Sequence, residues 1–116
     1  MPLEKQIFIP KLNQEIEFVV GKSAQENFDI IEEAEPHDIW FHVEGMPSCH
    51  VIAKVARDFN KKELAPIIKQ GCLLCKIQSK YANIQKLPIV YTKVKNVEKL
   101  ERVGSVALKN EKTMVI

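Results

Sequence analysis

The 116 residues are enough for about one domain with a single hydrophobic core, so we expect residues 1–116 to fold as one unit. A composition of 46% hydrophobic and 28% charged residues, with four glycines, excludes a disordered or low-complexity chain. No apolar run approaches the roughly 20 residues of a membrane span, and the N-terminus lacks a secretory signal, so we expect a cytoplasmic protein without a membrane partner. Three cysteines, an odd number, argue against a closed disulfide framework.

The charges divide unevenly along the chain. Residues 1–50 hold three basic and ten acidic residues, whereas residues 51–116 hold fourteen basic and five acidic ones. The halves therefore carry about −7 and +9, although the formal net charge is only +2. This asymmetry is equally compatible with a basic surface for a polyanion and with attraction between the two halves in the fold.

The N-terminal part predicts a hairpin followed by a short helix. Two extended runs within residues 7–22 flank a turn at Asn13-Gln14, which is typical of a β-hairpin. Ser23 stands three residues before Glu26, as in a capping box, and we expect a helix that begins there and ends before Pro36.

The stretch PHDIWFHVEGMPSCHVIAKV, residues 36–55, contains the only tryptophan, all three histidines and one cysteine. Its alternation predicts two strands joined by a turn. If His42 lies opposite His50, the other sheet face is wholly apolar, whereas a slip of one residue mixes the faces, so burial favours this register. The register also pairs Trp40 with Ile52 and Asp38 with Lys54. The sequence therefore predicts one sheet face that carries the tryptophan, two histidines and a lysine.

The C-terminal half predicts a long helix and further strands. Helical spacing of apolar residues runs from Lys61 to about Ser79, where Pro66 is tolerable only in the first turn. LPIVYTKVKNV, residues 87–97, reads as a strand with Lys93 and Lys95 on one face, and SVALK and TMVI read as short closing strands. We therefore expect a single α+β domain in which a largely antiparallel sheet is covered by two helices.

Several segments occur in the order and at the separations of a known family. They are the Gly-Lys and Asn of VGKSAQEN, the block DIWFHVEGMPSCHVI, and VYTKVKNVEKL with GSVALKNEKTMVI behind it. In these features the chain resembles the NFACT RNA-binding domain from about Ile7 to Ile116. The large NFACT proteins are ribosome-associated quality-control factors that engage a stalled large subunit and tRNA, with this domain as their C-terminal module. The resemblance thus implies a role in translation.

The chain departs from the family pattern at two places. The turn that usually reads Pro-Gly-Ser-His is Pro47-Ser48-Cys49-His50 here, and NVEKLERVGSV replaces a Lys-Pro-x-Gly-Ala-x-Pro-Gly segment. We also expect the module to be free-standing. The tailing of stalled chains, which depends on the N-terminal domain and coiled coil of the large proteins, is therefore not carried over.

Cys72 and Cys75 have the spacing of two zinc ligands. Residues that could complete such a site are Cys49, His50, His42 and His37. Both cysteines fall inside the expected helix, not in the turn that a structural zinc site usually uses, and a redox pair would open a helix. We therefore interpret them as structural and expect no metal or other cofactor.

His42 and His50 on one strand face could form a general acid/base pair. Asp38 is the only near carboxylate, and Ser48 lacks the context of an activated nucleophile. A structural role, in which the histidines link the strand pair to the following turn, is the favoured interpretation. That role is also compatible with binding.

Nucleic-acid binding needs cationic groups that follow phosphates and flat side chains that stack on bases. The predicted binding residues are Lys22, Trp40, His42, His50, Lys54, Lys93 and Lys95. Trp40 supports base stacking if it is accessible, and if it is buried only the lysines and histidines are left to bind. Lys22 precedes the expected helix start, whose N–H groups could help to hold a phosphate, but Glu17 stands where a P-loop needs its first glycine.

The sequence therefore predicts a module that binds structured RNA, tRNA or rRNA, without catalysing a reaction. The ribosome and a larger NFACT protein are the other expected partners. A protein-interaction adaptor that grips a ribosomal protein with the same surface is the main alternative. A histidine-dependent enzyme or a zinc protein is the remaining one.

Overall fold

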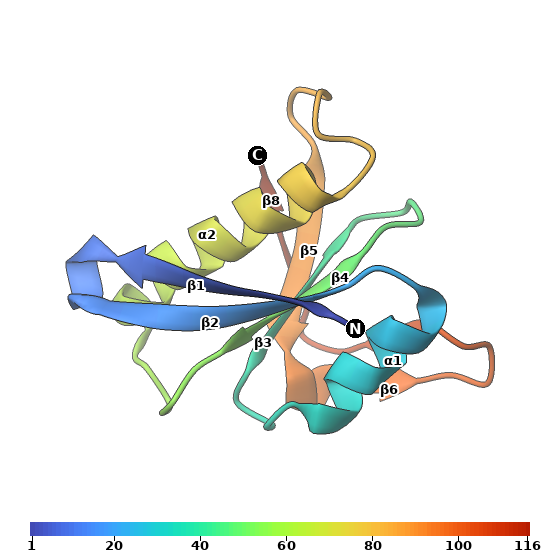
Figure 1. The fold of residues 1–116 in the computed structure, drawn as a ribbon, viewed down its shortest axis with the longest axis horizontal. Coiled ribbons are helices and arrows are strands. Elements are labelled where there is room, and N and C mark those ends of the chain that lie inside the picture. The colour runs from blue at the N-terminus through green and yellow to red at the C-terminus, as the bar shows by residue number, and fades with distance from the viewer.

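The computed structural model describes residues 1–116 and contains two α-helices and eight strands (Figure 1). Six strands form one antiparallel sheet in the order β1-β2-β4-β3-β5-β8, and β6 pairs with β7 in a separate hairpin. This arrangement confirms the expected α+β class. The elements are β1 (Leu3–Ile9), β2 (Gln14–Gly21), α1 (Ala24–Glu33), β3 (Ile39–Val43), β4 (His50–Lys54), α2 (Lys61–Gln78), β5 (Pro88–Lys93), β6 (Val97–Lys99), β7 (Val106–Leu108) and β8 (Lys112–Val115).

Both helices begin at a capping residue. The Ser23 hydroxyl accepts a hydrogen bond from the Glu26 N–H at 3.1 Å, as predicted. The Glu26 carboxylate accepts from the Lys22 N–H at 2.9 Å, one residue before its usual partner in a capping box. At α2, Asn60 and Glu63 form the complete box. Local side-chain chemistry therefore determines where each helix starts.

The longer helix, α2, covers one face of the sheet. Phe41 and Val51, from the apolar positions of β3 and β4, are fully buried and pack with Ile67 and Cys72 of the helix. Gly71 lies directly over Phe41, and a Cβ at this position would be 2.2 Å from Phe41 Cζ. The helix can approach the sheet this closely because Gly71 has no side chain.

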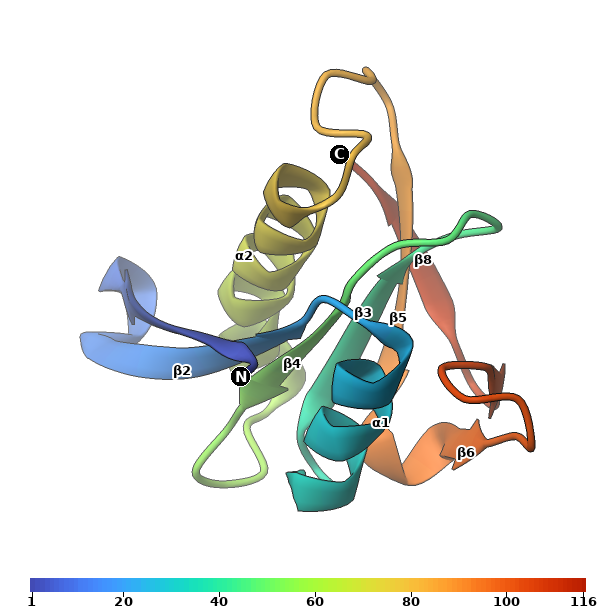
Figure 2. The same cartoon turned by 45° about the vertical axis from the view of Figure 1, so that its right-hand side comes forward.

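The shorter helix, α1, and the β6–β7 hairpin pack on the opposite face. Trp40 of β3 and Ile52 of β4 lie against Ile30 and Ile31 of α1. Figure 2 shows α2 on one side of strands β3–β5 and α1 on the other. Because α1 has 10 residues and α2 has 18, the second face is covered over a shorter length.

One expectation about α2 was wrong. Pro66 is the sixth residue of the helix and so lies beyond its first turn. The missing N–H of Pro66 would have bonded to the carbonyl of Lys62, an exposed residue, so water can replace the lost bond.

The strand expected over residues 87–97 is shorter in the structure. β5 ends at Lys93, and a 3₁₀ turn over Val94–Asn96 follows, so Lys95 is not on a strand. The chain bends here because the N–H groups of Val94 and Lys95 donate to carbonyls of the loop before β3. The two closing strands do not pair with each other, since β7 joins β6 and β8 joins β5.

Candidate nucleic-acid interface

The two central strands pair in the predicted register. His42 lies opposite His50, and Trp40 lies opposite Ile52. The tryptophan and both histidines therefore share the sheet face on which α1 packs. Trp40 itself is buried, with 1% of its surface exposed. Its ring cannot stack on a base from solvent in this structure, and the lysines and histidines are left as candidate contacts.

A chain of hydrogen bonds connects Trp40, His50 and Asn27. Trp40 Nε1–H donates to His50 Nδ1 at 3.1 Å, and the His50 backbone N–H donates to Asn27 Oδ1 at 3.1 Å. Asn27 reaches this position across Gly21, where a Cβ would be 2.4 Å from Oδ1. Because an indole N–H can only donate, Nδ1 of His50 carries no proton and the neutral ring carries its proton on Nε2.

Both imidazoles of the pair are kept neutral. Burial, reinforced by the neighbouring His42, lowers the pKa of His50 to about 3. Burial also lowers the pKa of His42. The His42 ring stacks on Trp40 with centroids 5.7 Å apart and meets the His50 ring edge-on at 4.9 Å. At neutral pH the pair therefore offers hydrogen-bonding nitrogens and a flat surface without positive charge.

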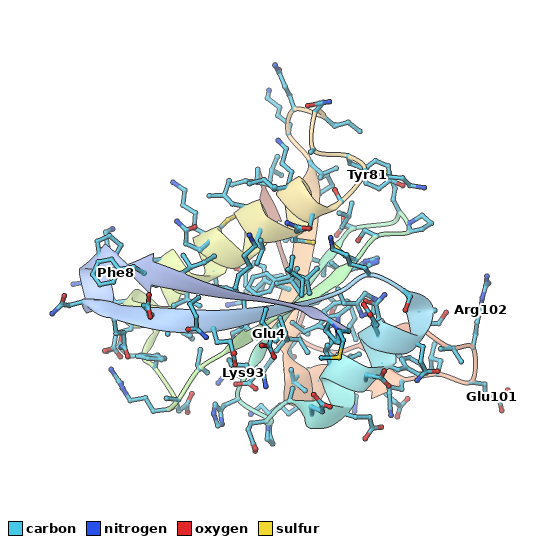
Figure 3. The ribbon with its side chains drawn as sticks, viewed as in Figure 1. Glu4, Phe8, Tyr81, Lys93, Glu101 and Arg102 are labelled. Atoms are coloured by element: carbon cyan, nitrogen blue, oxygen red, sulfur yellow. The ribbon has the colours of Figure 1, made fainter.

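A cleft of about 690 Å³ opens over these rings. Its walls come from the start of α1, the β3–β4 turn and the β6–β7 loop, which lie on one side of the molecule (Figure 1). Its floor consists of Asn27, Trp40, His42 and His50. Arg102 lines the rim and extends outward from the β6–β7 loop (Figure 3). Two carboxylates, Glu44 and Glu111, also line the cleft.

A second hollow, of about 440 Å³, adjoins the cleft at the start of α1. It shares four lining residues with the cleft, namely Ala24, Asn27, Pro47 and Ser48. It adds Lys22, which precedes α1, and Lys80, which follows α2, and both lysines are exposed. Arg102 thus lines the cleft together with two carboxylates, and Lys22 and Lys80 line the adjoining hollow.

Lys54 shares the sheet face of His50 but lies at the other end of β4. The two residues are four apart, which is about 13 Å along a strand. Lys54 pairs across the strands with Glu17, and the hollow beside it is rich in carboxylates. These are Glu15, Glu17, Glu33, Glu35 and Asp38. Its charge is therefore compensated by the acidic half of the chain.

Lys93 and Lys95 are also separated from the cleft. Lys93 lies opposite Ile39, which places its side chain on the α2 face, and it pairs with Asp58 at 3.4 Å. There it lines a smaller groove of about 250 Å³ together with Tyr91 and Lys112. Lys95 is exposed in the 3₁₀ turn after β5. Figure 3 shows Lys93 and Arg102 in different parts of the molecule. The structure thus brings four of the seven predicted residues together and places three elsewhere.

Three residues at the cleft were not among the predicted binding residues. Asn27 stands in the VGKSAQEN element, so a signal existed, but nothing in the sequence shows that its amide reaches His50. Lys80 and Arg102 are single cations in connecting segments, and only the fold brings them near the histidines.

The cysteines and His37 lie in other surroundings. Cys49, Cys72 and Cys75 are buried free thiols, and burial raises the pKa of Cys72 to about 12, so that this thiol stays protonated. A ring nitrogen of His37 lies 2.9 Å from the Val55 carbonyl oxygen. No group of three or more His, Cys, Asp or Glu side chains is placed to hold a metal ion.

Comparison with known proteins places the chain in a family. The model of the NFACT protein RNA binding domain matches residues 7–110, nearly the whole chain. The chain belongs to the NFACT RNA-binding domain family. The resemblance found in the sequence is thereby confirmed, and RNA is the partner class that this NFACT domain shares with its family.

Curated relatives of this NFACT domain are longer proteins. Coiled-coil domain-containing protein 25 of Mus musculus is 29% identical over 101 residues, which cover 84% of this chain and 49% of that protein. The Danio rerio protein of the same name is 32% identical over 82 residues, which cover 69% of this chain and 40% of that protein. The homologue from Dictyostelium discoideum is 32% identical over 100 residues, covering 80% and 47%. The chain spans about half the length of the curated relatives it matches.

A solved structure has the same fold. It is the C-terminal part of the fibronectin/fibrinogen-binding protein from Streptococcus suis, which superimposes with a TM-score of 0.83 at 18% identity and covers 100% of this chain and 45% of that one. At this identity the likeness concerns the fold alone. In this NFACT domain, neither α1 nor α2 combines the length and apolar character needed to cross a bilayer.

Proposed function

We propose that residues 1–116 act as one domain that binds tRNA or rRNA in the cytoplasm, in translation or ribosome quality control, without catalysing a reaction. The observation that carries this proposal is the cleft with a neutral floor at His42 and His50, which has Arg102 in its lining and adjoins a hollow lined by Lys22 and Lys80. Cations around a concave surface are the arrangement that attracts and orients a phosphate backbone. The family supports RNA as the ligand.

The surroundings of the two histidines support a binding role over a catalytic one. His50 uses Nδ1 to accept from Trp40, and its lowered pKa leaves it a poor general base near pH 7. The nearest carboxylate in sequence, Asp38, accepts hydrogen bonds from the N–H groups of Glu35 and Val55, so it acts as a structural cap and orients neither imidazole. The arrangement lacks the base and orienting carboxylate of a catalytic triad.

The binding proposal is tested by titrating labelled tRNA and rRNA fragments with the purified domain at about 50 mM salt and at higher salt. We expect a complex whose affinity falls as salt rises, because phosphate contacts release counterions. Absence of any complex at low salt would overturn the proposal. Crosslinking in cells, followed by sequencing of the attached RNA, then identifies the target and tests the link to the ribosome.

A further inference from the structure

The His50 ring has one hydrogen-bonding atom that the protein does not use. Nδ1 accepts from Trp40, and no protein group bonds to Nε2. No buried side-chain nitrogen or oxygen lacks a partner, so Nε2 must reach the accessible surface although His50 is only 2% exposed. His50 lines the cleft. The cleft floor therefore presents an N–H donor whose proton Trp40 fixes in place.

Asn27 contributes a second donor in the same way. Its Oδ1 accepts from the His50 backbone N–H, which assigns the amide orientation and leaves the Nδ2 hydrogens without a protein partner. Asn27 is 6% exposed and lines both the cleft and the adjoining hollow. Two largely buried polar side chains thus keep unused donors in the cleft, and Asn27 also lines the adjoining hollow.

The floor suits a flat and uncharged ligand. The His42 ring is half-buried over Trp40 and parallel to it, with an angle of 12° between the planes. A phosphate on this floor would lie on two imidazoles that are neutral at pH 7, because Lys22 and Lys80 line the adjoining hollow and Arg102 belongs to the β6–β7 loop. The cleft volume, about 690 Å³, lies within the roughly 300 to 1,000 Å³ of small-ligand sites.

We propose that the cleft takes one unpaired nucleobase with a carbonyl group, which lies against His42 and accepts hydrogen bonds from His50 Nε2–H and Asn27 Nδ2. Arg102 in the cleft and Lys22 and Lys80 in the adjoining hollow hold the adjacent phosphates. This proposal rests on the RNA-binding function proposed above and adds to it the part of the RNA that is recognised. A base inside a duplex is stacked and paired, and cannot enter such a cleft. The domain therefore recognises loops, bulges or ends in preference to continuous helices.

The first test compares two single-stranded RNAs of about ten nucleotides, one of uridines and one of the same length whose riboses carry no base. Both have the same phosphate charge, and uracil has carbonyl acceptors. We expect the base-free strand to bind about tenfold more weakly or worse, because it loses stacking and hydrogen bonding. Equal affinities would overturn the base cleft and leave RNA binding intact. Failure of both strands, together with tRNA and rRNA fragments, would overturn the binding function itself.

The second test asks whether the base binds in this cleft. The affinity for the uridine strand is divided by the affinity for the base-free strand, and this ratio is measured for two variants. His42→Ala removes the flat ring. Asn27→Asp keeps the acceptor for the His50 N–H and removes the amide donor. Both ratios are expected to fall toward one, whereas the exposed control Lys95→Ala keeps the parent ratio. Because each ratio comes from one protein sample, a loss of folded material does not imitate the effect. Unchanged ratios in both variants would overturn the placement.

The third test concerns the carbonyl group. A strand of about ten adenosines has a larger stacking surface but no carbonyl oxygen on its bases. We expect it to bind more weakly than the uridine strand, since the two donors on the floor then face no carbonyl. Equal or tighter binding of the adenosine strand would overturn the carbonyl assignment.

Discussion

The sheet face under α2 and the sheet face under α1 are made by the same two central strands, yet the α2 side keeps a groove of about 250 Å³ and the α1 side a cleft of about 690 Å³. Under α2, Phe41 and Val51 meet a helix of 18 residues that approaches closely at Gly71. Under α1, a helix of 10 residues covers Trp40, and a cleft remains where His42 and His50 lie. The comparison shows that the length of the covering helix, together with the alternation of the strands, determines which polar residues can meet a ligand.

The largest expected effect is a loss of stability at the face that α2 covers. Gly71→Ala places a Cβ 2.2 Å from Phe41 Cζ and forces α2 away from the sheet. Alanine gains about 1 kcal/mol in helix propensity, but overpacking of this kind costs about 3 kcal/mol or more. We expect a net loss of about 2 kcal/mol in the free energy of unfolding, measured by urea denaturation.

Lys69→Ala, at an exposed position of the same helix, is the control and is expected to change stability little. Folded Gly71→Ala protein should keep its RNA affinity, because the cleft lies on the other face. A variant of unchanged stability would contradict the close packing of α2, and a specific loss of RNA binding would contradict the separation of the two faces.

His50, on the face under α1, is expected to make the stability depend on pH. His50 has a folded-state pKa of about 3 against 6.5 for the free group, so below pH 6.5 the unfolded chain binds more protons. Stability is therefore full above pH 6.5 and is lost as the pH falls toward 3, by roughly 1 kcal/mol per pH unit. The lowered pKa of His42 acts in the same direction.

Urea unfolding at pH 7 and pH 5 measures this dependence before most carboxylates titrate. His50→Asn keeps a hydrogen-bond acceptor for Trp40 but cannot take up a proton, so it should lower the slope between these pH values. The same slope in the parent and in His50→Asn would show that His50 is not buried in neutral form.

A smaller effect distinguishes the lysines around the cleft from those elsewhere. Lys22→Ala removes an exposed cation of the hollow that adjoins the cleft, whereas Lys95→Ala removes an exposed cation that lines neither of them. We expect Lys22→Ala to weaken RNA binding and to reduce the slope of log affinity against log salt by about 0.7, as one lost phosphate contact does for a single strand. Lys95→Ala should change neither. The reverse result would move the interface to the 3₁₀ turn after β5.

Much of this comparison could be predicted from the sequence. Alternation over Ile39–Val43 and His50–Lys54 gave the register, because only one pairing keeps one face apolar. The caps at Ser23 and Asn60 rest on side-chain chemistry within four residues, which is local information. Local patterns thus predicted both helices, most of the strands and the shared face of the histidines.

The rest of the site depends on contacts between distant segments. The alternation of β5 does not reveal that Lys93 lies opposite Ile39, and so on the α2 face, because that pairing depends on how two strands meet. The burial of Trp40 requires knowledge of where α1 packs. Arg102 reaches the cleft from the β6–β7 loop, and the sequence pattern did not predict that β6 and β7 pair.

The most direct test of the central claim is a ¹H–¹⁵N NMR titration of the labelled domain with a single-stranded uridine RNA. The chain has one tryptophan, so a single indole N–H signal reports on the hydrogen bond from Trp40 to His50. Gly104 of the β6–β7 loop also lines the cleft. We predict that the indole signal and the backbone signals of Asn27, His42 and Gly104 shift on binding. The backbone signals of Tyr91, Lys93 and Lys112 should stay in place. Shifts confined to the second group would contradict the account, because they would place the RNA in the groove beside α2.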